Sequence, residues 1–380
     1  MQMQRNSCIV VLGLEEQGLA LVQCFSRCHR DVHFFVDTRK GKQFREYTSF
    51  GVKHRFDSID SLRRELESLQ LNYKDRLRLF ISSASLLTDI RFSFREIYDL
   101  YCVSSCPLNW VDLFSTKNRM YDYVSSKGCQ IPRYKLLNDY SCGDLVFPFV
   151  LKRNIEKILS FKTIIINSQS EFEYVLSQIK DDHEDIIAQE FVGGTDWVDL
   201  SYHGYIDKGI ICGDLVVEEI RHYPTGVSCF LKEVAPDLSK MISTQINDLL
   251  IDTDYSGFIQ VDLKYHRGSH QSMIMDINTR TPGSHSVFYR KFINWKEFYS
   301  GIPDNPIPLI KNNKRIRWIN IDRDMRATRI LDSPFSTIKD SLSSDWDVFC
   351  WQDPFPFIMS FFLPIKVRLS ILFNKVFRVK

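Results

Sequence analysis

Two aspartates, an asparagine and an arginine lie close together between residues 257 and 284, in the stretch GFIQVDLKYHRGSHQSMIMDINTRTPGS. The stretch reads as two strands of alternating apolar and polar side chains, joined by a polar turn. In an antiparallel hairpin Asp262 and Asp276 can converge on one face. Two carboxylates and the amide oxygen of Asn278 are hard oxygen ligands, which suit Mg²⁺, or alternatively Mn²⁺, bound together with substrate phosphates. The alternative is a pair of solvated aspartates on an exposed hairpin face.

Size and composition exclude several functional classes. The 380 residues can bury a large core and suggest two or three domains. A formal net charge of +2 is too small to indicate a nucleic-acid partner. The ten cysteines form no C-x-x-C pair, which favours reduced thiols in the cytoplasm. The start does not read as a signal peptide, and no apolar run has the length of a membrane span.

The chain opens with a β-α-β pattern. Residues 7–12 and 32–37 read as strands and residues 19–27 as a helix, which predicts the start of a parallel sheet. The intervening turn is G-L-E-E-Q-G, so the G-x-G-x-x-G fingerprint of dinucleotide binding is absent. The opening therefore suggests a nicotinamide-dependent oxidoreductase only weakly.

Basic residues lie in apolar contexts in the middle of the chain. Lys117 belongs to a predicted helix over 110–127, and Lys152 ends a predicted strand over 147–152. The connector 153–162 is basic and has no glycine. A further strand over 186–192 ends in Gln-Glu-Phe-Val-Gly-Gly.

These elements imply three parts. We predict a Rossmann-like α/β domain over 1–108 and a second domain over 109–300, with subdomains about 109–185 and 186–300. A C-terminal extension over 301–380 follows, in which residues 315–324 could form a final strand.

The ordered set of features resembles the ATP-grasp superfamily, in the branch of carboxylate–amine ligases related to biotin carboxylase and D-aspartate ligase. The set is a small α/β domain, two lysines, the Gln-Glu-Phe-Val stretch and the Asp262…Asp276-x-Asn278-x-Arg280 hairpin. The resemblance covers roughly residues 8 to 290. It implies an α/β N-terminal domain followed by an α+β ATP-grasp fold, whose two subdomains clasp ATP.

The resemblance assigns nucleotide contacts to five residues. Lys117 and Lys152 match the two lysines that reach the nucleotide phosphates, and lysine is a compact point charge suited to that task. Glu190 and Val192 match the hinge that binds adenine, and Asp199 lies where the family has an acid for the ribose hydroxyls.

The resemblance also assigns the reacting end of the site. Asp262, Asp276 and Asn278 match the metal ligands, although the family usually has Glu where both aspartates stand. Arg280 would neutralise the γ-phosphate or an acyl-phosphate, and Arg221 lies where relatives carry a basic residue facing the reactants.

A second departure from the family is the glycine-free connector. Relatives often have glycines there, so closure over ATP would rely on the side chains of Lys157 or Lys162.

The implied function is ATP-dependent formation of an amide from small-molecule carboxylate and amine substrates, through an acyl-phosphate intermediate. A cell-envelope or polysaccharide precursor would fit as the substrate. The two departures from the family pattern favour a competing function, an ATP-binding module without turnover.

The last 27 residues, from Pro354, contain five basic residues and no acid. If residues 366–380 are helical, apolar side chains gather on one face and basic ones on the other. That pattern suits a helix on the anionic inner face of a membrane, and the alternative is a helix docked on the protein's own core. The resemblance also admits a homodimer.

Overall fold

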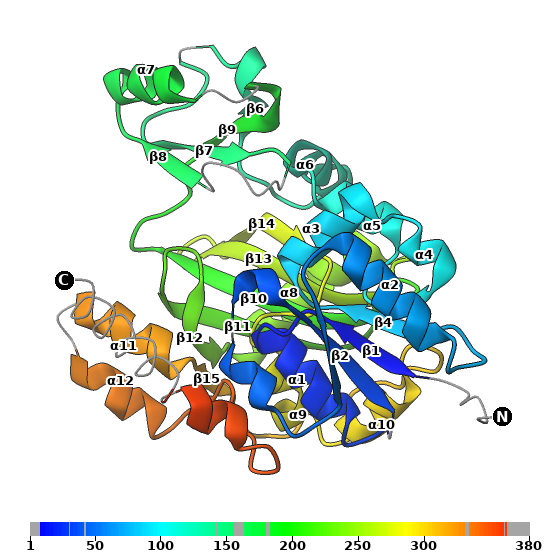
Figure 1. Ribbon diagram of the computed structural model, residues 1–380. Helices are drawn as coiled ribbons and strands as arrows, with labels where there is room; N and C mark the ends of the chain where they lie inside the picture. Colours follow the sequence, from blue (N-terminus) through cyan, green and yellow to red (C-terminus); the bar gives the residue numbers. More distant parts are fainter. Residues whose placement is uncertain are drawn as a thin grey trace, which may run out of the picture. The chain divides into compact units, whose positions relative to one another are not determined.

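The computed structural model describes residues 8–29, 31–41, 43–141, 143–155, 163–179, 183–330, 334–360 and 362. The chain forms two compact units (Figure 1). The first comprises residues 1–105, 221–230 and 283–380, and the second comprises residues 106–220 and 231–282. In this division the C-terminal segment belongs with the N-terminal domain, whereas the sequence-based division into 1–108, 109–300 and 301–380 treats it as a separate extension.

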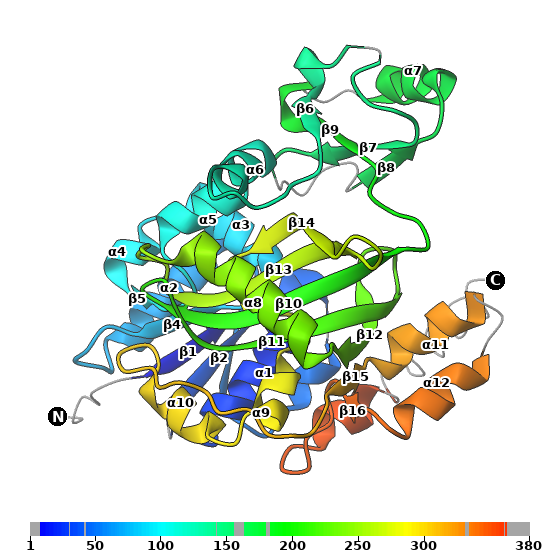
Figure 2. The ribbon, with the colours of Figure 1, turned by 180° about the vertical axis from the view of Figure 1, so that it is seen from behind.

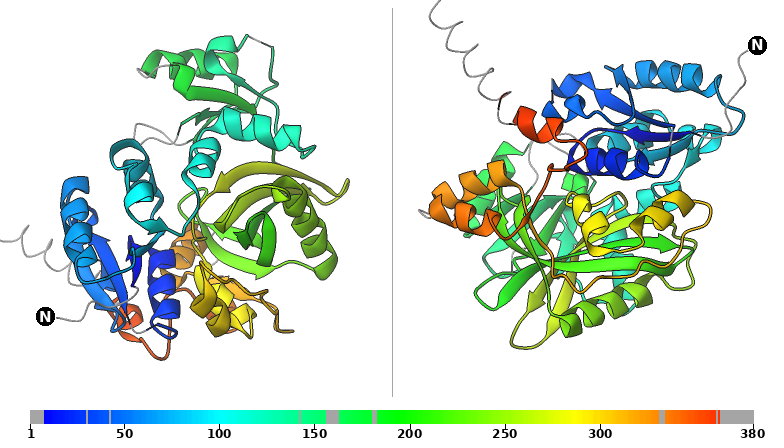
Figure 3. Two further views of the ribbon diagram at one scale, coloured as in Figure 1. Left: turned by 90° about the vertical axis from the view of Figure 1, so that its right-hand side faces the viewer. Right: turned by 90° about the horizontal axis from the view of Figure 1, so that it is seen from below.

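The first unit is built on a five-stranded sheet in the order β3-β2-β1-β4-β5, with every pair parallel. Strand β1 reads IVVL and is buried throughout, as expected for a parallel strand covered on both faces. Right-handed crossovers place α1 on one face and α2 on the other (Figure 3). The elements are β1 (Ile9–Leu12), α1 (Glu16–Phe25), β2 (Val32–Asp37), η1 (Thr38–Lys40), η2 (Phe44–Tyr47), β3 (Val52–Phe56), α2 (Ile59–Gln70), β4 (Arg78–Ile81), α3 (Ala84–Ser93), α4 (Ile97–Leu100) and β5 (Cys102–Val103).

The C-terminal part of this unit is mostly helical. Its elements are η5 (His285–Val287), α9 (Phe288–Lys291), α10 (Trp295–Gly301), β15 (Arg317–Ile319), α11 (Ile321–Ile330), α12 (Pro334–Ser341) and β16 (Asp345–Trp346). The predicted strand over 315–324 was wrong beyond Ile319. Asn320 caps α11, since its Oδ1 accepts a hydrogen bond from the backbone nitrogen of Arg323 at 3.1 Å, and the chain turns helical there.

The second unit contains a small four-stranded sheet, ordered β6-β9-β7-β8, with α7 above it (Figure 1). Phe149, Leu151 and Ile186 of the sheet pack with Phe172 of α7 in one apolar core. The elements are β6 (Tyr134–Leu136), η3 (Leu137–Asp139), β7 (Phe149–Arg153), β8 (Thr163–Ile166), α7 (Gln169–Gln178), η4 (His183–Asp185) and β9 (Ile186–Glu190).

A larger mixed sheet runs in the order β14-β13-β10-β11-β12-β15-β16. Helix α8 lies over one face of its β10 and β13 strands (Figure 2) and buries Ile242, Ile246 and Leu249. The new elements are β10 (Trp197–Asp207), β11 (Ile210–His222), β12 (Ser228–Glu233), α8 (Pro236–Leu250), β13 (Gly257–His266) and β14 (Gln271–Asn278). The face of β10, β13 and β14 away from α8 carries the polar side chains described below.

The predicted single helix over 110–127 was wrong, because it is two helices, α5 (Leu108–Phe114) and α6 (Lys117–Ser126). Thr116 is extended and pairs with Ile155 in an isolated bridge. Asn154 completes the break, because its backbone oxygen accepts from the backbone nitrogen of Lys117 at 2.7 Å. Lys117 therefore stands at the start of a helix.

Gly18 in α1 should be intolerant of any side chain. A Cβ there would lie 2.3 Å from the backbone oxygen of Gly13 and 2.7 Å from Oγ of Ser82. We expect Gly18→Ala to lower the free energy of unfolding by about 1–3 kcal/mol, despite the better helix propensity of alanine. The matched control is Gly301→Ala, whose Cβ would meet its nearest atom at 3.9 Å. Equal thermal midpoints for the two variants would contradict the packing described here.

Candidate active site

The hairpin of β13 and β14 sets two carboxylates opposite each other. Asp262 and Asp276 are register partners, and Gln260 pairs with Asn278. The register shifts directly after Asp262, where Leu263 pairs with Ile274. This bulge lies between the two aspartates and the turn. Asp262 and Asp276 therefore still converge on one face, as the sequence predicts.

Asp262 lies in an environment that resists its negative charge. Its Oδ1 accepts hydrogen bonds from Ser201 at 3.0 Å and from Gln260 at 2.9 Å. Burial and the nearby carboxylates of Glu219 and Asp276 nevertheless raise the pKa of Asp262 to about 7. A cation placed here would relieve that excess of negative charge.

Asp276 has the opposite balance. Burial alone would raise its pKa, but the ammonium groups of Lys117 and Lys152 outweigh burial and lower it. Lys117 Nζ, at the start of α6, donates to Asp276 Oδ1, and the backbone nitrogen of Ile277 donates to the same oxygen at 2.8 Å. Asp276 is therefore ionised and held by an ion pair.

Lys152 on β7 belongs to the same cluster. Burial and then the charge of Lys117 lower its pKa to about 8, while Asp276 and Asp262 act in the opposite direction. The two lysines predicted to reach nucleotide phosphates thus come together beside the two predicted metal ligands, although they are 35 residues apart in the sequence.

Asn278 and Arg280 extend the cluster along β14 and just beyond it. Asn278 Nδ2 lies 3.5 Å from Asp262 Oδ2, and Arg280 Nη2 lies 3.5 Å from Asn278 Oδ1. Arg280 also donates from Nη1 to the backbone oxygen of Thr281 at 3.2 Å. No carboxylate contact to Arg280 is found among the described residues, so its guanidinium has donors left for an anionic ligand.

Glu190 and Val192 stand at the end of β9. Both carboxylate oxygens of Glu190 accept from Arg133, one from its backbone nitrogen and one from its Nε, each at 2.8 Å. The side chain of Glu190 is thereby occupied, which leaves backbone groups of this segment as the means of contacting a base. Val192 is buried, and Phe191 between them is 42% exposed.

The remaining predicted residues make ion pairs. Asp199 on β10 pairs with Lys264 at 2.6 Å. Arg221 belongs to the first unit, where it binds Asp324 through two hydrogen bonds of 2.7 and 2.9 Å and Asp340 through a third of 2.8 Å. Its guanidinium is therefore committed to carboxylates of its own unit. Lys157 and Lys162 lie outside the described residues.

Sequence reasoning missed three polar neighbours of Asp262. Ser201 and His203 share one face of β10, and Ser201 is the register partner of Asp262. His203 is buried, which lowers its pKa to about 4, so its imidazole is neutral. Glu219 on β11 is the third neighbour. The alternation Asp199-x-Ser201-x-His203 could have revealed the first two, because alternate side chains of a strand share a face.

The donor set fits a metal that arrives with phosphates. Within the part of the chain that the structure describes, no three His, Cys, Asp or Glu side chains are grouped as a self-contained metal site. Mg²⁺ usually needs only one or two carboxylates when substrate phosphates and water complete its octahedron. Burial and the carboxylates of Glu219 and Asp276 disfavour the charge of Asp262, and a bound cation would offset that cost.

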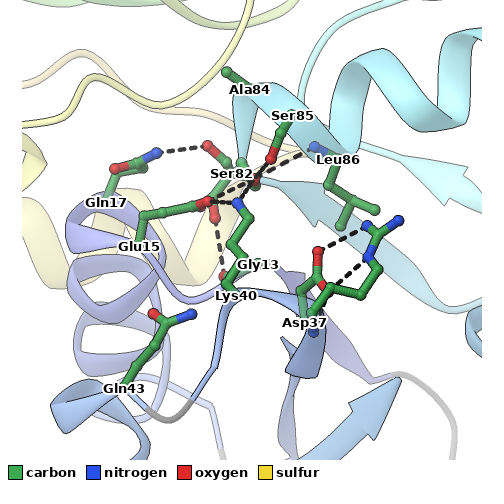
Figure 4. A network of polar contacts seen from close by, with 12 residues as sticks. Gly13, Glu15, Gln17, Asp37, Lys40, Gln43, Ser82, Ala84, Ser85 and Leu86 are labelled. Atoms are coloured by element: carbon green, nitrogen blue, oxygen red, sulfur yellow. Dashed lines mark hydrogen bonds and ion pairs between the residues drawn. The ribbon is translucent and has the colours of Figure 1, made fainter. Parts of the chain in front are cut away.

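A second polar cluster lies in the first unit, at the carboxyl ends of its parallel strands (Figure 4). Lys40 donates to Glu15 and, at 3.0 Å, to Ser83, and Ser83 donates to Glu15 Oε1 at 2.7 Å. Glu15 Oε2 is buried without a hydrogen-bond partner. The strand order reverses between β1 and β4, and ligands of open α/β sheets bind in the crevice at such a switch point.

The raised pKa of Asp262 predicts a pH-dependent stability. Between about pH 4 and 7 the folded chain keeps a proton that the unfolded chain releases, so stability falls as pH rises. Asp262→Asn removes this loss and should stabilise the nucleotide-free protein at pH 8 by roughly 1–3 kcal/mol, with little change near pH 4. Thermal unfolding across this range measures the effect.

Asp199→Asn is the matched control, because Asp199 is paired with a lysine. It should show no gain at pH 8. A loss of stability at pH 8 in Asp262→Asn would contradict the assignment of excess negative charge to this position.

No protein-family model and no curated protein matches this sequence. Solved structures do match it. An ADP complex of N5-carboxyaminoimidazole ribonucleotide synthetase is 11% identical, covers 87% of this chain and 86% of its own, and has a TM-score of 0.65. The L-amino acid ligase from Bacillus licheniformis is 13% identical, with coverages of 81% and 76% and a TM-score of 0.58.

A third similar structure is the biotin carboxylase domain dimer of 2-oxoglutarate carboxylase from Hydrogenobacter thermophilus, in complex with MgADP, ADP and bicarbonate. It is 10% identical, covers 80% of this chain and 72% of its own, and has a TM-score of 0.61. At these identities the likeness establishes architecture. The chain has the ATP-grasp fold, preceded by an α/β domain, as its sequence predicts.

Proposed function

We propose that this protein is an ATP-dependent carboxylate–amine ligase that forms an amide through an acyl-phosphate intermediate. The observation that carries the proposal is the cluster of Asp262, Asp276, Lys117 and Lys152, which the β13–β14 hairpin, the start of α6 and strand β7 bring together. Opposite charges held this close, with Arg280 at the edge, suit a polyanion and its counter-ion. The ATP-grasp fold supports the same function.

Nucleotide binding in this proposal uses the second unit. Lys117 and Lys152 contact the phosphates, and the segment from Glu190 to Val192 contacts adenine through its backbone, because Arg133 occupies the Glu190 carboxylate. Asp199 accepts from the ribose hydroxyls with its Oδ2, because Lys264 pairs with its Oδ1 and can stay in place.

The reacting groups lie at the hairpin. Asp262, Asp276 and Asn278 would hold Mg²⁺ or Mn²⁺, and the ion supplies charge neutralisation between phosphates and orients them. Arg280 has donors free for the transferred phosphoryl group. Arg221 would reach reactants only after leaving Asp324, so we assign it no catalytic step here and keep its role as a prediction from the resemblance.

Two steps give the product. The substrate carboxylate oxygen attacks the γ-phosphorus of ATP, which releases ADP and leaves an acyl-phosphate. The amine nitrogen then attacks the acyl carbon, loses a proton and displaces phosphate. Positioning and charge stabilisation supply most of the rate in such transfers.

The Glu15–Lys40–Ser83 cluster of the first unit is a separate candidate contact for a small molecule. The unpartnered Glu15 Oε2 suits an ammonium or amide donor, and Lys40 suits a carboxylate. A substrate that bears both groups would satisfy the pair. A cell-envelope or polysaccharide precursor stays a proposal drawn from the basic C-terminal tail.

The competing candidate is an ATP-binding module without turnover. The observation that favours it is the occupation of two predicted contacts by the protein's own side chains, Asp276 by Lys117 and Glu190 by Arg133. Turnover with a carboxylate and an amine separates the two candidates.

We also propose a cytoplasmic protein that associates with the inner face of the membrane through its tail. No helix among the described residues is long and apolar enough to cross a bilayer. Residues 363–380 lie outside the described residues, so the amphipathic helix remains a prediction, as does a homodimer.

Lys152→Ala tests nucleotide binding. ATP with Mg²⁺ at a hundredfold excess over Kd should stabilise the wild-type protein by about 2.7 kcal/mol through mass action, and the variant should lose most of that stabilisation. The matched control is Lys135→Ala on β6, an exposed lysine that pairs with Asp144. Thermal shift measures both. An unaltered ATP response in Lys152→Ala would remove this lysine from the site.

Asp276→Asn tests catalysis. The change keeps the volume but removes a charge and the partner of Lys117, so we expect ADP release to fall by about two orders of magnitude or more while the protein stays folded. ADP release is measured with a panel of amino acids and uronic acids. Asp144→Asn, in the segment before β7 where the carboxylate pairs with Lys135, should release ADP at the wild-type rate. Wild-type turnover in Asp276→Asn would refute the metal assignment.

A further inference from the structure

A cavity of about 250 Å³ lies within the first unit, lined only by residues of that unit. It forms where the N-terminal domain meets the C-terminal segment, and it contains none of the residues of the proposed ATP site. The lining is Glu16, Phe44, Arg45, Ile319, Asn320, Ile321, Asp322, Arg323, Met325, Trp346, Asp347, Val348, Phe357 and Ser360.

One part of the lining is apolar and aromatic. The rings of Trp346 and Phe357 stack at 5.1 Å, and Phe44, Met325 and Val348 add further apolar surface. A cavity of roughly 150 Å³ with such walls already holds benzene. The space here accommodates an aromatic or branched aliphatic group together with a small polar head.

A second part of the lining has an excess of positive charge. Arg45 and Arg323 both donate to Oε1 of Glu16, the second at 2.7 Å. Burial raises the pKa of Glu16, but the two guanidinium groups outweigh burial and hold it below its usual value. Two arginines sharing one carboxylate leave a formal charge of +1, and Nε of Arg45 is buried without a partner.

A third part of the lining is an acid that lacks a positive partner. Asp347 is 8% exposed, and the only side-chain donor found for it among the described residues is Asn320 Nδ2, at 2.8 Å. Burial and the charge of Glu16 raise the pKa of Asp347 to about 7, although Arg45 and Arg323 lower it. A cationic group beside Asp347 would offset both effects.

We propose that this cavity binds a zwitterionic α-amino acid with an apolar side chain. Its ammonium contacts Asp347, its carboxylate contacts Arg45 and Arg323, and its side chain packs against the stacked pair of Trp346 and Phe357 and against Phe44. The charges then balance, because the Arg45–Arg323–Glu16 group carries +1 and ionised Asp347 carries −1. An anion alone would leave Asp347 without a partner, and a cation alone would leave Arg45 Nε without one. The inference does not depend on the ligase proposal.

Calorimetry without nucleotide tests the charge requirement. L-Phenylalanine is compared with phenethylamine, which lacks the carboxylate, and with 3-phenylpropionate, which lacks the ammonium. We expect L-phenylalanine to bind the wild-type protein at least about tenfold more tightly than either analogue, since each lacks one paired charge. Equal affinity for either analogue, or no binding of L-phenylalanine up to about 10 mM, would overturn the proposal.

Asp347→Asn tests the ammonium contact. The variant should lose about tenfold or more in affinity for L-phenylalanine while it keeps its affinity for 3-phenylpropionate. Asp345→Asn is the matched control, two positions earlier and outside the lining, where the carboxylate pairs with Lys314 at 3.2 Å. Unchanged L-phenylalanine binding in Asp347→Asn, or an equal loss in Asp345→Asn, would contradict the assignment.

A pH series on the wild-type protein gives the same test without a mutation. The charged groups facing Asp347 are Glu16, Arg45 and Arg323. The pKa of Glu16 is lowered, whereas that of Asp347 is raised to about 7, so Asp347 is the acid that titrates near neutral pH. Affinity for L-phenylalanine should fall severalfold from pH 7.5 to about 6 as Asp347 gains its proton, whereas 3-phenylpropionate should not bind more weakly. An L-phenylalanine affinity that stays flat over this range would overturn the role of Asp347.

Discussion

The burial of two facing carboxylates, Asp262 and Asp276, is the constraint around which the second unit is organised. An antiparallel register holds them opposite each other on one sheet face. Burial removes water from each carboxylate and disfavours its charge, and for Asp262 the carboxylates of Glu219 and Asp276 add to that cost. Two cations from outside the hairpin offset this cost, namely Lys117 at the start of α6 and Lys152 on β7. The break between α5 and α6 places the ammonium group of Lys117 beside the aspartates. Strand β7 does the same for Lys152.

The lysines stabilise the negative charge of Asp276 more than that of Asp262. The two aspartates therefore have different pKa values. Asp276 receives the lysines and stays ionised, whereas Asp262 faces Glu219 and has a pKa of about 7. One carboxylate is therefore a fixed charge, and the other responds to the arrival of a cation. Two residues of the same type acquire different behaviour from their neighbours alone.

Much of the fold follows from local patterns in the sequence. The strand Val32–Asp37 was predicted with the bounds that the structure has, because an apolar run bordered by polar residues marks it sharply. The ATP-grasp fold was predicted from the order of its elements and is confirmed. Alternation predicted that Asp262 and Asp276 converge on one face of a hairpin, and the structure sets them opposite each other.

Contacts between distant segments could not be predicted. Asn154 divides the helix predicted over 110–127 through a backbone contact with Lys117 from a distant segment. Arg221 binds Asp324, which lies 103 positions further along the chain. The cavity of the first unit joins Glu16 to Arg323 across 307 positions. Pairs of this kind depend on tertiary packing, which a single sequence read by period and propensity does not contain.

The ion pair between Lys117 and Asp276 has a consequence for the order in which ligands arrive. Without nucleotide, the ammonium of Lys117 serves as the resident counter-ion of Asp276. A divalent cation that comes alone must displace that ammonium and leave it unpaired, which opposes binding. A cation that comes with a polyphosphate brings the lysine a new partner in the same event. In the proposed function, each ligand would therefore increase the affinity for the other by the same factor, as thermodynamic linkage requires. Lys117 would thus make the site selective for a cation–polyphosphate complex over the free cation.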